Sequence, residues 1–182
     1  MPEAPRPAGH AESPCVKAKN AALRLLTYRS RSEKEIRRRL QGRFTGEVID
    51  RTLSDLRRQG LLDDAAFARE WREQRENFRP RGPGVIRQEL QRLGVDCEVI
   101  RDALSGFDAA ANAYRAGSRY AAKLPVGDAG AFRRKLGRFL HRRGFEGEVL
   151  GQTVERLCRE LFDPLHGGVD GDGQDNQTEE SR

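Results

Sequence analysis

The chain has 182 residues, of which 36% are hydrophobic and 34% are charged, and its formal net charge at pH 7 is +6. No apolar run approaches the roughly 18 residues of a membrane span, and the first residues lack the apolar centre of a signal peptide, which excludes a membrane protein and predicts a cytoplasmic one. Because the composition is more polar than that of a usual compact domain, we expect a thin, elongated fold.

The charge is distributed unevenly along the chain. Residues 17–162 carry 32 basic and 20 acidic side chains, and 27 of the 32 cations are Arg. Residues 17–62 and 105–162 are the basic parts, whereas residues 63–104 are close to neutral. Guanidinium groups make fork-like contacts to phosphates and carboxylates, so this distribution favours a polyanionic partner. The alternative is an ordinary solvated surface of charged helices.

The first predicted helices follow a Pro/Ala-bearing N-terminal extension. The first of them is expected to run from Asn20 to Tyr28. Ser32 and Glu35 have the form of a capping box, which predicts that a second helix starts there. A third helix is expected to begin after Thr45, since Thr is a good N-cap residue, and Gly60 has the position of a C-terminal stop.

A second set of three helices follows. The first is expected from Asp64 to Phe78, with Phe67 and Trp71 facing the core. The run Gly82-Pro83-Gly84 predicts a turn with Pro in the first turn of the next helix, because Pro is well suited to that position. Asp96 is a good N-cap type and predicts the start of the last helix of this set.

The third set completes the predicted helices. Its first helix is expected from Asp108 to Ala122, with Tyr114 facing the core, and Pro125 separates this helix from the next. The last helix is expected after Glu146, a poorer N-cap type. The Gly/Asp-rich tail from Asp163 has almost no apolar residue and is predicted to be disordered. No segment alternates in the manner of a strand.

Comparison of the chain with itself reveals a repeat of about fifty residues. Apolar residues recur at five positions of each copy: Ile36, Ile86 and Leu136; Leu40, Leu90 and Leu140; Phe44, Val95 and Phe145; Ile49, Ile100 and Leu150; Leu53, Leu104 and Val154. The predicted fold is therefore all-α, with three tandem three-helix repeats that form an elongated, curved solenoid. The expected parts are a disordered extension (1–17), repeats at 18–62, 63–104 and 105–162, and a disordered acidic tail (163–182).

Patterns of catalytic or metal-binding residues are weak. The three cysteines are widely spaced and form no CxxC pair, and the three histidines are equally scattered, so we expect no metal and no cofactor. The adjacent carboxylates Asp63 and Asp64 precede a helix, where acids cap the free amides and favour the helix dipole, and this role is preferred to acid–base chemistry.

The turn Gly82-Pro83-Gly84 begins like a dinucleotide-binding loop, but Arg87 stands in the place of the last Gly and no strand precedes it. Its free amides, together with Arg79 and Arg81, are suited to hold a phosphate. The alternative interpretation is simple initiation of the following helix.

Cations recur in the middle of each repeat. In the run Arg37-Arg38-Arg39, the inward positions of Ile36 and Leu40 place Arg38 opposite the core. We predict that Arg38, Arg87, Arg134 and Arg138 share one concave face. The full set of candidate polyanion contacts is Arg37, Arg38, Arg81, Arg87, Arg92, Arg133, Arg134, Lys135, Arg138, Arg142 and Arg143.

Three stretches of the chain resemble the repeat signatures of the RecX family, the bacterial regulators of the RecA recombinase. They are ALRLLTYRSRSEKEIRRRL, GLLDDAAFAREW continuing to RPRGPGVIRQELQRLGV, and RRGFEGEVL. The resemblance covers about Asn20 to Leu161, and the central match is the most diagnostic. The structural motif residues that we select there are Asp63, Asp64, Phe67, Gly82, Pro83, Ile86 and Leu90. The connection Gln41 to Phe44 is shorter than its counterparts in the other two copies and departs from them.

The resemblance implies a non-enzymatic protein that binds the RecA–DNA nucleoprotein filament. It implies inhibition of RecA ATPase, strand exchange and co-protease activity in homologous recombination, DNA repair and the SOS response. The expected partner is the RecA filament, and direct contact with single- or double-stranded DNA is an open alternative to contact with RecA alone. We expect no membrane association and a monomer. One alternative is a helix-turn-helix regulator that binds duplex DNA, although the segment Glu47 to Arg58 is rich in acids for a recognition helix. Another is a helical scaffold for unrelated proteins.

Overall fold

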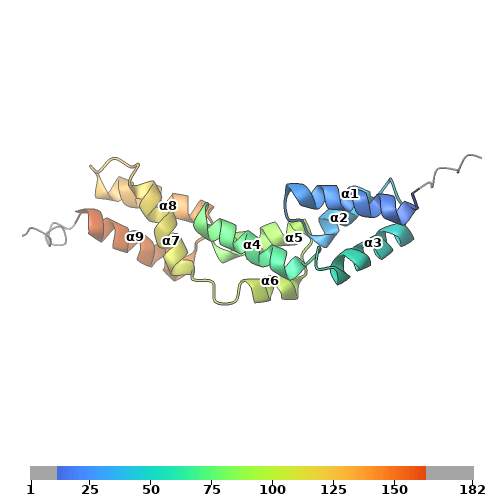
Figure 1. The fold of residues 1–182 in the computed structure, drawn as a ribbon. Coiled ribbons are helices and arrows are strands. Elements are labelled where there is room, and N and C mark those ends of the chain that lie inside the picture. The colour runs from blue at the N-terminus through green and yellow to red at the C-terminus, as the bar shows by residue number, and fades with distance from the viewer. Residues whose placement is uncertain (1–11, 163–182) are drawn as a thin grey trace, which may run out of the picture. The chain divides into compact units, whose positions relative to one another are not determined.

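Three-helix groups follow one another along the chain, as the repeat predicts (Figure 1). The computed structural model describes residues 12–162, and within this range it contains nine α-helices and no strand. The predicted all-α class and the three-helix repeats are thereby confirmed. The helices belong to two compact units: α1 to α6 form the first, and α7 to α9, with the short segment Pro80–Gly82, form the second. None of the described helices combines the length and the apolar character that crossing a bilayer requires.

The first three-helix group consists of α1 (Pro14–Tyr28), α2 (Glu33–Leu40) and α3 (Gly46–Arg58). Helix α1 begins six residues before the predicted start, because the Ser13 side chain accepts a hydrogen bond from the Val16 amide and Pro14 occupies the first turn. Residues 14–17, predicted as part of a disordered extension, are therefore helical. Residues 1–11 of that extension lie outside the described residues.

The predicted starts of α2 and α3, and the predicted stop after α3, are confirmed. The Ser32 side chain accepts from the Glu35 amide over 3.2 Å, as the first half of a capping box requires. Helix α3 follows Thr45, whose side chain makes no capping hydrogen bond. Gly60 lies two residues beyond α3 with φ of +67°, a left-handed conformation that favours glycine at a helix end.

The second group consists of α4 (Asp64–Asn77), α5 (Pro83–Leu93) and α6 (Cys97–Ala103). The Asp63 carboxylate accepts from the amides of Ala65 and Ala66 at 2.8 and 3.0 Å, so its predicted capping role is confirmed. Pro83 is the first residue of α5, as expected from its fixed φ angle.

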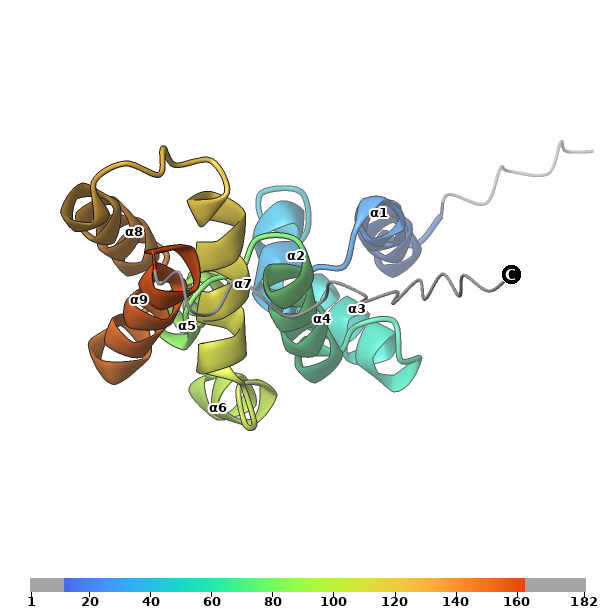
Figure 2. The same ribbon diagram turned by 90° about the vertical axis from the view of Figure 1, so that its left-hand side faces the viewer.

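The third group consists of α7 (Ala109–Ala121), α8 (Ala129–Arg142) and α9 (Gly147–Phe162), and each of its helices contacts the other two (Figure 2). Gly117 allows α7 to approach α9 closely: a Cβ atom at this position would lie 2.6 Å from Leu157 Cδ1. Residues 163–182, predicted as a disordered acidic tail, lie outside the described residues.

Each group has its own apolar core, and the repeated positions of the sequence form it. Ile36, Ile86 and Leu136 are fully buried in the three cores, one in each. The same holds for Leu40, Leu90 and Leu140. Burial of one such side chain stabilises the fold by about 1.5–3 kcal/mol. The sequence repeat is therefore a repeat of the core.

Candidate functional site

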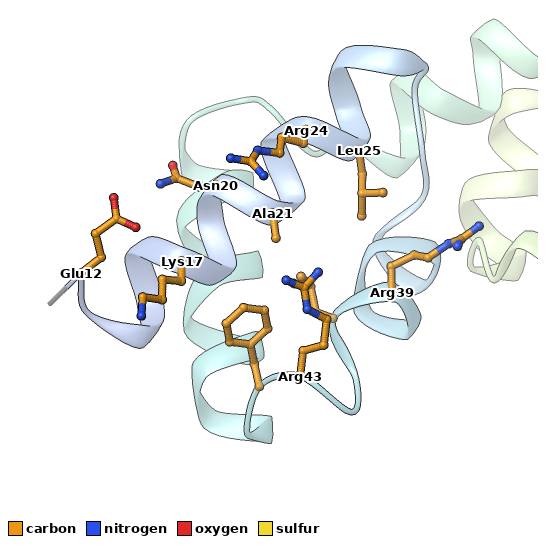
Figure 3. Close-up of a pocket in the computed structure, with 10 residues that line it drawn as sticks. Glu12, Lys17, Asn20, Ala21, Arg24, Leu25, Arg39 and Arg43 are labelled. Carbon is orange, nitrogen blue, oxygen red and sulfur yellow. The ribbon is translucent and has the colours of Figure 1, made fainter.

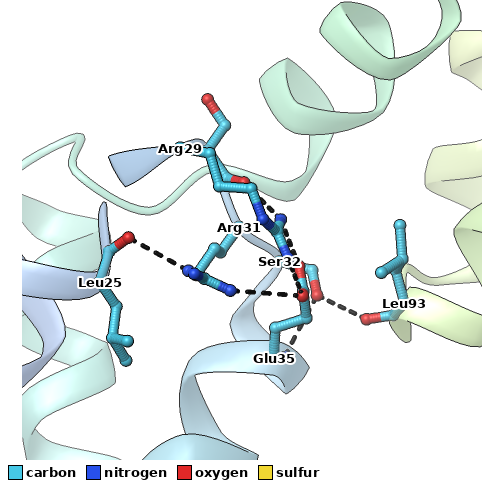
Figure 4. A network of polar contacts seen from close by, with 7 residues as sticks. Leu25, Arg29, Arg31, Ser32, Glu35 and Leu93 are labelled. Atoms are coloured by element: carbon cyan, nitrogen blue, oxygen red, sulfur yellow. Dashed lines mark hydrogen bonds and ion pairs between the residues drawn. The ribbon is translucent and has the colours of Figure 1, made fainter. Parts of the chain in front are cut away.

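The buried carboxylate of Glu35 holds two arginines at the start of α2 (Figure 4). Arg29 donates to both oxygens of Glu35, with Nη1–Oε2 at 3.1 Å and Nη2–Oε1 at 2.5 Å. Arg31 Nη1 lies 3.7 Å from the same carboxylate, and Arg31 Nε donates to the Leu25 carbonyl over 3.1 Å. These contacts connect the end of α1 to the start of α2.

The Glu35 carboxylate stays ionised because its partners outweigh its burial. Desolvation by burial raises its pKa, but the hydrogen bond and the charge of Arg29, the Ser32 backbone amide and the charge of Arg31 together hold the pKa below its usual value. The contribution of the Ser32 amide is the second half of the predicted capping box. Glu35 therefore works as a structural anion.

The same region joins the first group to the second within the first unit. Ser32 Oγ donates to the Leu93 carbonyl, and the Glu33 amide donates to Asp64 Oδ1 over 2.8 Å. Burial raises the pKa of the Asp64 carboxyl, an effect that the Glu33 hydrogen bond opposes. Gly94 has φ of +86°, and a side chain there would collide with that of Lys34. Asp64 thus connects two helical groups.

Arg37 belongs to this structural set. Its guanidinium lies 2.6 Å from Asp50 on α3 and 3.7 Å from Glu33 on α2. Its side chain is 37% exposed, so it is half-buried between two helices. We call Arg29, Arg31 and Arg37 the anchored arginines, because carboxylates of their own group hold each of them.

Most other candidate polyanion contacts lie on the surface. The exposed candidates that form no ion pair within residues 12–162 are Arg38, Arg87, Arg92, Arg133, Lys135, Arg138 and Arg142. Arg134 is also exposed, and its guanidinium lies 3.9 Å from the exposed Asp128 carboxylate. Arg38 is on α2, Arg87 on α5, and Arg134 and Arg138 on α8, so the second helix of each group presents at least one exposed cation.

Arg143 and Arg81 differ from these surface cations because both are partly buried. Within the second unit, the Arg143 guanidinium lies 5.0 Å from the Phe139 ring centroid, and its Nη1 is 3.5 Å from the Pro80 carbonyl. The Gly82 amide donates to the Arg143 carbonyl over 2.8 Å. One of the amides of this turn, that of Gly82, is therefore already occupied. Pro83 begins α5, as the alternative interpretation requires, and the phosphate site stays a prediction.

A hollow of about 760 Å³ in the first group gathers cations that the sequence did not bring together (Figure 3). Its lining residues come from the start and one face of α1 and from the end of α2 with the following connection: Glu12, Lys17, Asn20, Ala21, Arg24, Leu25, Arg39, Leu40, Arg43 and Phe44. We call this hollow the cationic groove, since four of its residues are basic and one is acidic.

The groove cations have no carboxylate partner among the described residues. Neither Lys17 nor Arg24 on α1 forms an ion pair there, and the same is true of Arg39. Arg43 lies over the Phe44 ring, 5.7 Å from its centroid, and its side chain extends toward α1 (Figure 3). The helical spacing from Lys17 to Arg24 would have revealed one side of the groove, had α1 been predicted to begin before Asn20.

Residues suited to chemistry are scattered. Among residues 12–162 no group of three or more His, Cys, Asp or Glu side chains is arranged to hold a metal ion. Cys15, Cys97 and Cys158 are free thiols, of which Cys158 is buried and Cys97 exposed. The cationic groove, in contrast, gathers four basic side chains in one hollow.

Two family models match the chain. The model of the first three-helix domain of RecX matches residues 18–56, and that of the second three-helix domain matches residues 63–104. The chain is 36% identical over 146 residues to regulatory protein RecX of Chlorobium phaeobacteroides (strain BS1), a match that covers 79% of this chain and 95% of that protein. It is 38% identical over 146 residues to regulatory protein RecX of Mycolicibacterium smegmatis (strain ATCC 700084 / mc(2)155), covering 75% and 77% of the two chains.

Solved structures show the same fold. The crystal structure of RecX from Lactobacillus salivarius superposes with a TM-score of 0.70 at 22% identity, covering 79% of this chain and 96% of that one. A second crystal structure, of a regulatory protein RecX, gives a TM-score of 0.64 at 28% identity, covering 78% and 72% of the two chains.

Proposed function

Because this chain belongs to the RecX family, we propose that it is a non-enzymatic regulator that binds the RecA–DNA nucleoprotein filament and lowers RecA activity. The activities that it would restrain are ATP hydrolysis, strand exchange and co-protease function, in DNA repair and the SOS response. We further propose that it acts in the cytoplasm as a monomer, and that its helical repeats occupy residues 18–62, 63–104 and 105–162.

The observation that supports this proposal is the set of exposed cations on the second helix of each group. Arg38, Arg87 and Arg138 are exposed and engage no carboxylate within the described part of the chain. A nucleoprotein filament carries the negative charge of its DNA, and complementary charge both speeds association and selects the partner. A cation that is free in the unbound protein can make such a contact without first breaking an internal ion pair.

The repeated placement supports a partner with its own repeat. Each three-helix group presents a comparable exposed cation on its second helix. The arginines that carboxylates hold do not repeat at matching positions: Arg37 pairs with Asp50 in the first group, and Arg75 pairs with Glu89 in the second. A filament offers similar surfaces at regular intervals, so several weak contacts can act together. Linked contacts of this kind raise overall affinity well above that of any single one.

The test is ATP hydrolysis by the cognate RecA on single-stranded DNA, with this protein titrated from well below to equal the RecA concentration at near-physiological salt. We expect inhibition; inhibition at sub-stoichiometric amounts favours capping of filament ends over occupancy along the filament. No effect on hydrolysis, together with tight binding to bare duplex, would replace this proposal with the helix-turn-helix reader.

A variant with Glu at Arg38, Arg87, Arg134 and Arg138 tests the role of the exposed cations. It should need at least ~10-fold more protein for half-inhibition, because complementary charge is replaced by repulsion. The matched control reverses the same number of exposed cations that lie outside the candidate set, namely Arg51, Arg69, Lys123 and Arg159. Equal inhibition by the two folded variants would contradict the assignment of these contacts.

A further inference from the structure

None of the four groove cations belongs to the candidate contacts through which we propose that RecA is regulated. We propose that this groove binds the phosphodiester backbone of single-stranded DNA directly, in the absence of RecA. The inference goes beyond the proposed function, because it assigns a DNA site to residues outside the predicted contact set.

The first argument is charge. Lys17, Arg24, Arg39 and Arg43 line one hollow, and Glu12 is the only acid among its ten lining residues. Like charges placed together repel one another, and this repulsion falls when an anion binds between them. A concave site with one sign of charge also concentrates the field and raises the local concentration of anions.

The second argument is that these cations are available. In the same group, Glu35 and Asp50 hold the anchored arginines at distances down to 2.5 Å. The groove cations face no such carboxylate among the described residues, and the contact recorded for Arg43 is with the Phe44 ring. Guanidinium groups that form no internal ion pair offer their fork of donors to phosphate oxygens.

The third argument is the spacing of the two sides. Lys17 and Arg24 lie seven residues apart on α1, which corresponds to about 10 Å along the helix axis. Arg39 and Arg43 lie four residues apart on the other side, at the end of α2 and in the connection that follows. The cations therefore lie in two rows, one on each side of the groove, so that a bound chain can contact them with successive phosphates.

The floor of the groove favours a single strand over a duplex. The half-buried side chains of Ala21, Leu25 and Phe44 contribute apolar surface between the cations. A single strand can place its phosphates against the cations and its sugars and bases against apolar surface, a combination typical of single-strand binding sites. A duplex presents its charged backbone on a stiff rod and keeps its bases stacked inside. Asn20 adds one polar group to the lining.

The test measures fluorescence anisotropy of a labelled dT20 oligonucleotide with the full chain and without RecA. We compare the wild type with a groove variant (Arg24→Glu, Arg39→Glu, Arg43→Glu) and a control variant (Arg51→Glu, Arg69→Glu, Lys123→Glu). The three positions of the control variant are exposed and lie outside the groove lining. Thermal unfolding followed by circular dichroism establishes that both variants fold.

The groove variant should bind dT20 at least ~10-fold more weakly than the control variant. Each lost phosphate contact lowers the salt dependence of single-strand binding by about 0.7, so the slope of log K against log salt should fall by roughly 2. Equal affinity of the two variants, no dT20 binding by the wild type, or tighter binding of a duplex of the same length would each overturn the proposal. Displacement of dT20 by polyglutamate at equal charge concentration would assign the groove to an acidic protein surface instead.

This experiment is independent of RecA. Loss of dT20 binding in the groove variant supports the DNA site even if the wild-type chain leaves RecA ATPase unchanged. Conversely, inhibition of RecA by a chain whose groove variant binds dT20 normally leaves the regulatory proposal intact and removes only the DNA site.

Discussion

The anchored arginines and the cationic groove belong to the same three-helix group, yet they use the same residue type in opposite ways. Arg29 and Arg31 surround the buried Glu35 carboxylate, and Arg37 connects α2 to Asp50 on α3. The cations of the groove lie beside apolar residues and one exposed acid. What separates the two regions is the position of carboxylates, which decides whether a cation stabilises the fold or is available to a partner.

The small number of acidic side chains in the first group explains why the anchored arginines and the cationic groove differ. Residues 17–62 carry 13 basic and 5 acidic side chains. The acids that form ion pairs engage Arg29, Arg31, Arg37, Arg57 and Arg58. The remaining cations have few acids left to neutralise them, and several of these cations line the groove. An excess of charge at this level is suited to binding an external polyanion.

The largest expected effect comes from Leu40→Ala, which should disturb both the core that holds the anchored arginines in place and the cationic groove. Leu40 is fully buried in the first core and also lines the groove. Removal of its side chain should lower the free energy of unfolding by about 2–5 kcal/mol, through lost burial and the cavity that remains. Urea unfolding measures the loss, with Leu61→Ala, at a residue 46% exposed, as the control. A loss no greater than that of the control would show that this core is not as packed as described.

Glu35→Gln should affect the anchored arginines and leave the cationic groove unchanged. It leaves Arg29 and Arg31 without their carboxylate. Because Arg29 is 45% exposed, the loss should cost about 1–3 kcal/mol of stability, less than for a fully buried ion pair. Binding of dT20 by the folded variant should stay unchanged, because Glu35 is outside the groove. Chemical unfolding and anisotropy on the same sample check both statements. Glu47→Gln, at an exposed acid of α3, is the control for charge.

The same carboxyl group predicts a pH dependence. The pKa of Glu35 is lower in the folded protein than in the unfolded chain, where it is about 4.3. Its contribution to stability is therefore complete above the unfolded value and is lost as the pH falls through the folded value. The stability of the wild type should drop more steeply below about pH 4 than that of Glu35→Gln. Parallel curves for the two proteins would contradict the lowered pKa.

A smaller effect should distinguish two neighbours in the sequence. Arg37→Gln removes the ion pairs to Asp50 and Glu33 and should lower stability by about 0.5–1 kcal/mol, since these pairs are partly exposed. Arg38→Gln should leave stability unchanged and weaken inhibition of RecA. If Arg37→Gln instead weakened inhibition as strongly as Arg38→Gln, Arg37 would belong with the binding cations.

The smallest effect is expected for Asp64→Asn. Burial raises the pKa of this carboxyl, so its charged form is less stable in the folded protein, and that cost disappears as the pH falls through the folded pKa. Asparagine keeps an oxygen for the Glu33 amide without the charge. Thermal unfolding at pH 7 should show no loss and a gain of at most about 0.5 kcal/mol. A large loss would mean that the charge itself holds the two groups together.

The helical groups could be predicted from the sequence because their determinants are local. The repeated core residues Ile36, Ile86 and Leu136 follow helical periodicity, and Asp63 and Asp96 are side chains that cap the helix directly after them. The start of α1 was not predicted, because Ser13 and Pro14 belong to a Pro/Ala-bearing stretch whose composition indicates a disordered extension.

The binding features were harder to predict because they depend on packing. Arg37 and Arg38 are adjacent in the sequence, and only the position of Asp50 on another helix separates their roles. The groove requires α1 and the end of α2 to come together, which brings Arg24 near Arg43. Contacts between such distant positions leave no periodic signal in the sequence.

The most direct test of the central claim measures urea unfolding and RecA ATPase inhibition on two sets of charge reversals. One set changes the anchored cations Arg29, Arg31 and Arg37 to Glu, and the other changes the exposed cations Arg38, Arg87, Arg134 and Arg138 to Glu. We predict that the first set loses stability, and that the second keeps wild-type stability and loses inhibition. An exposed-cation variant that is fully folded and inhibits RecA as the wild type does would contradict the claim that these cations make the contact.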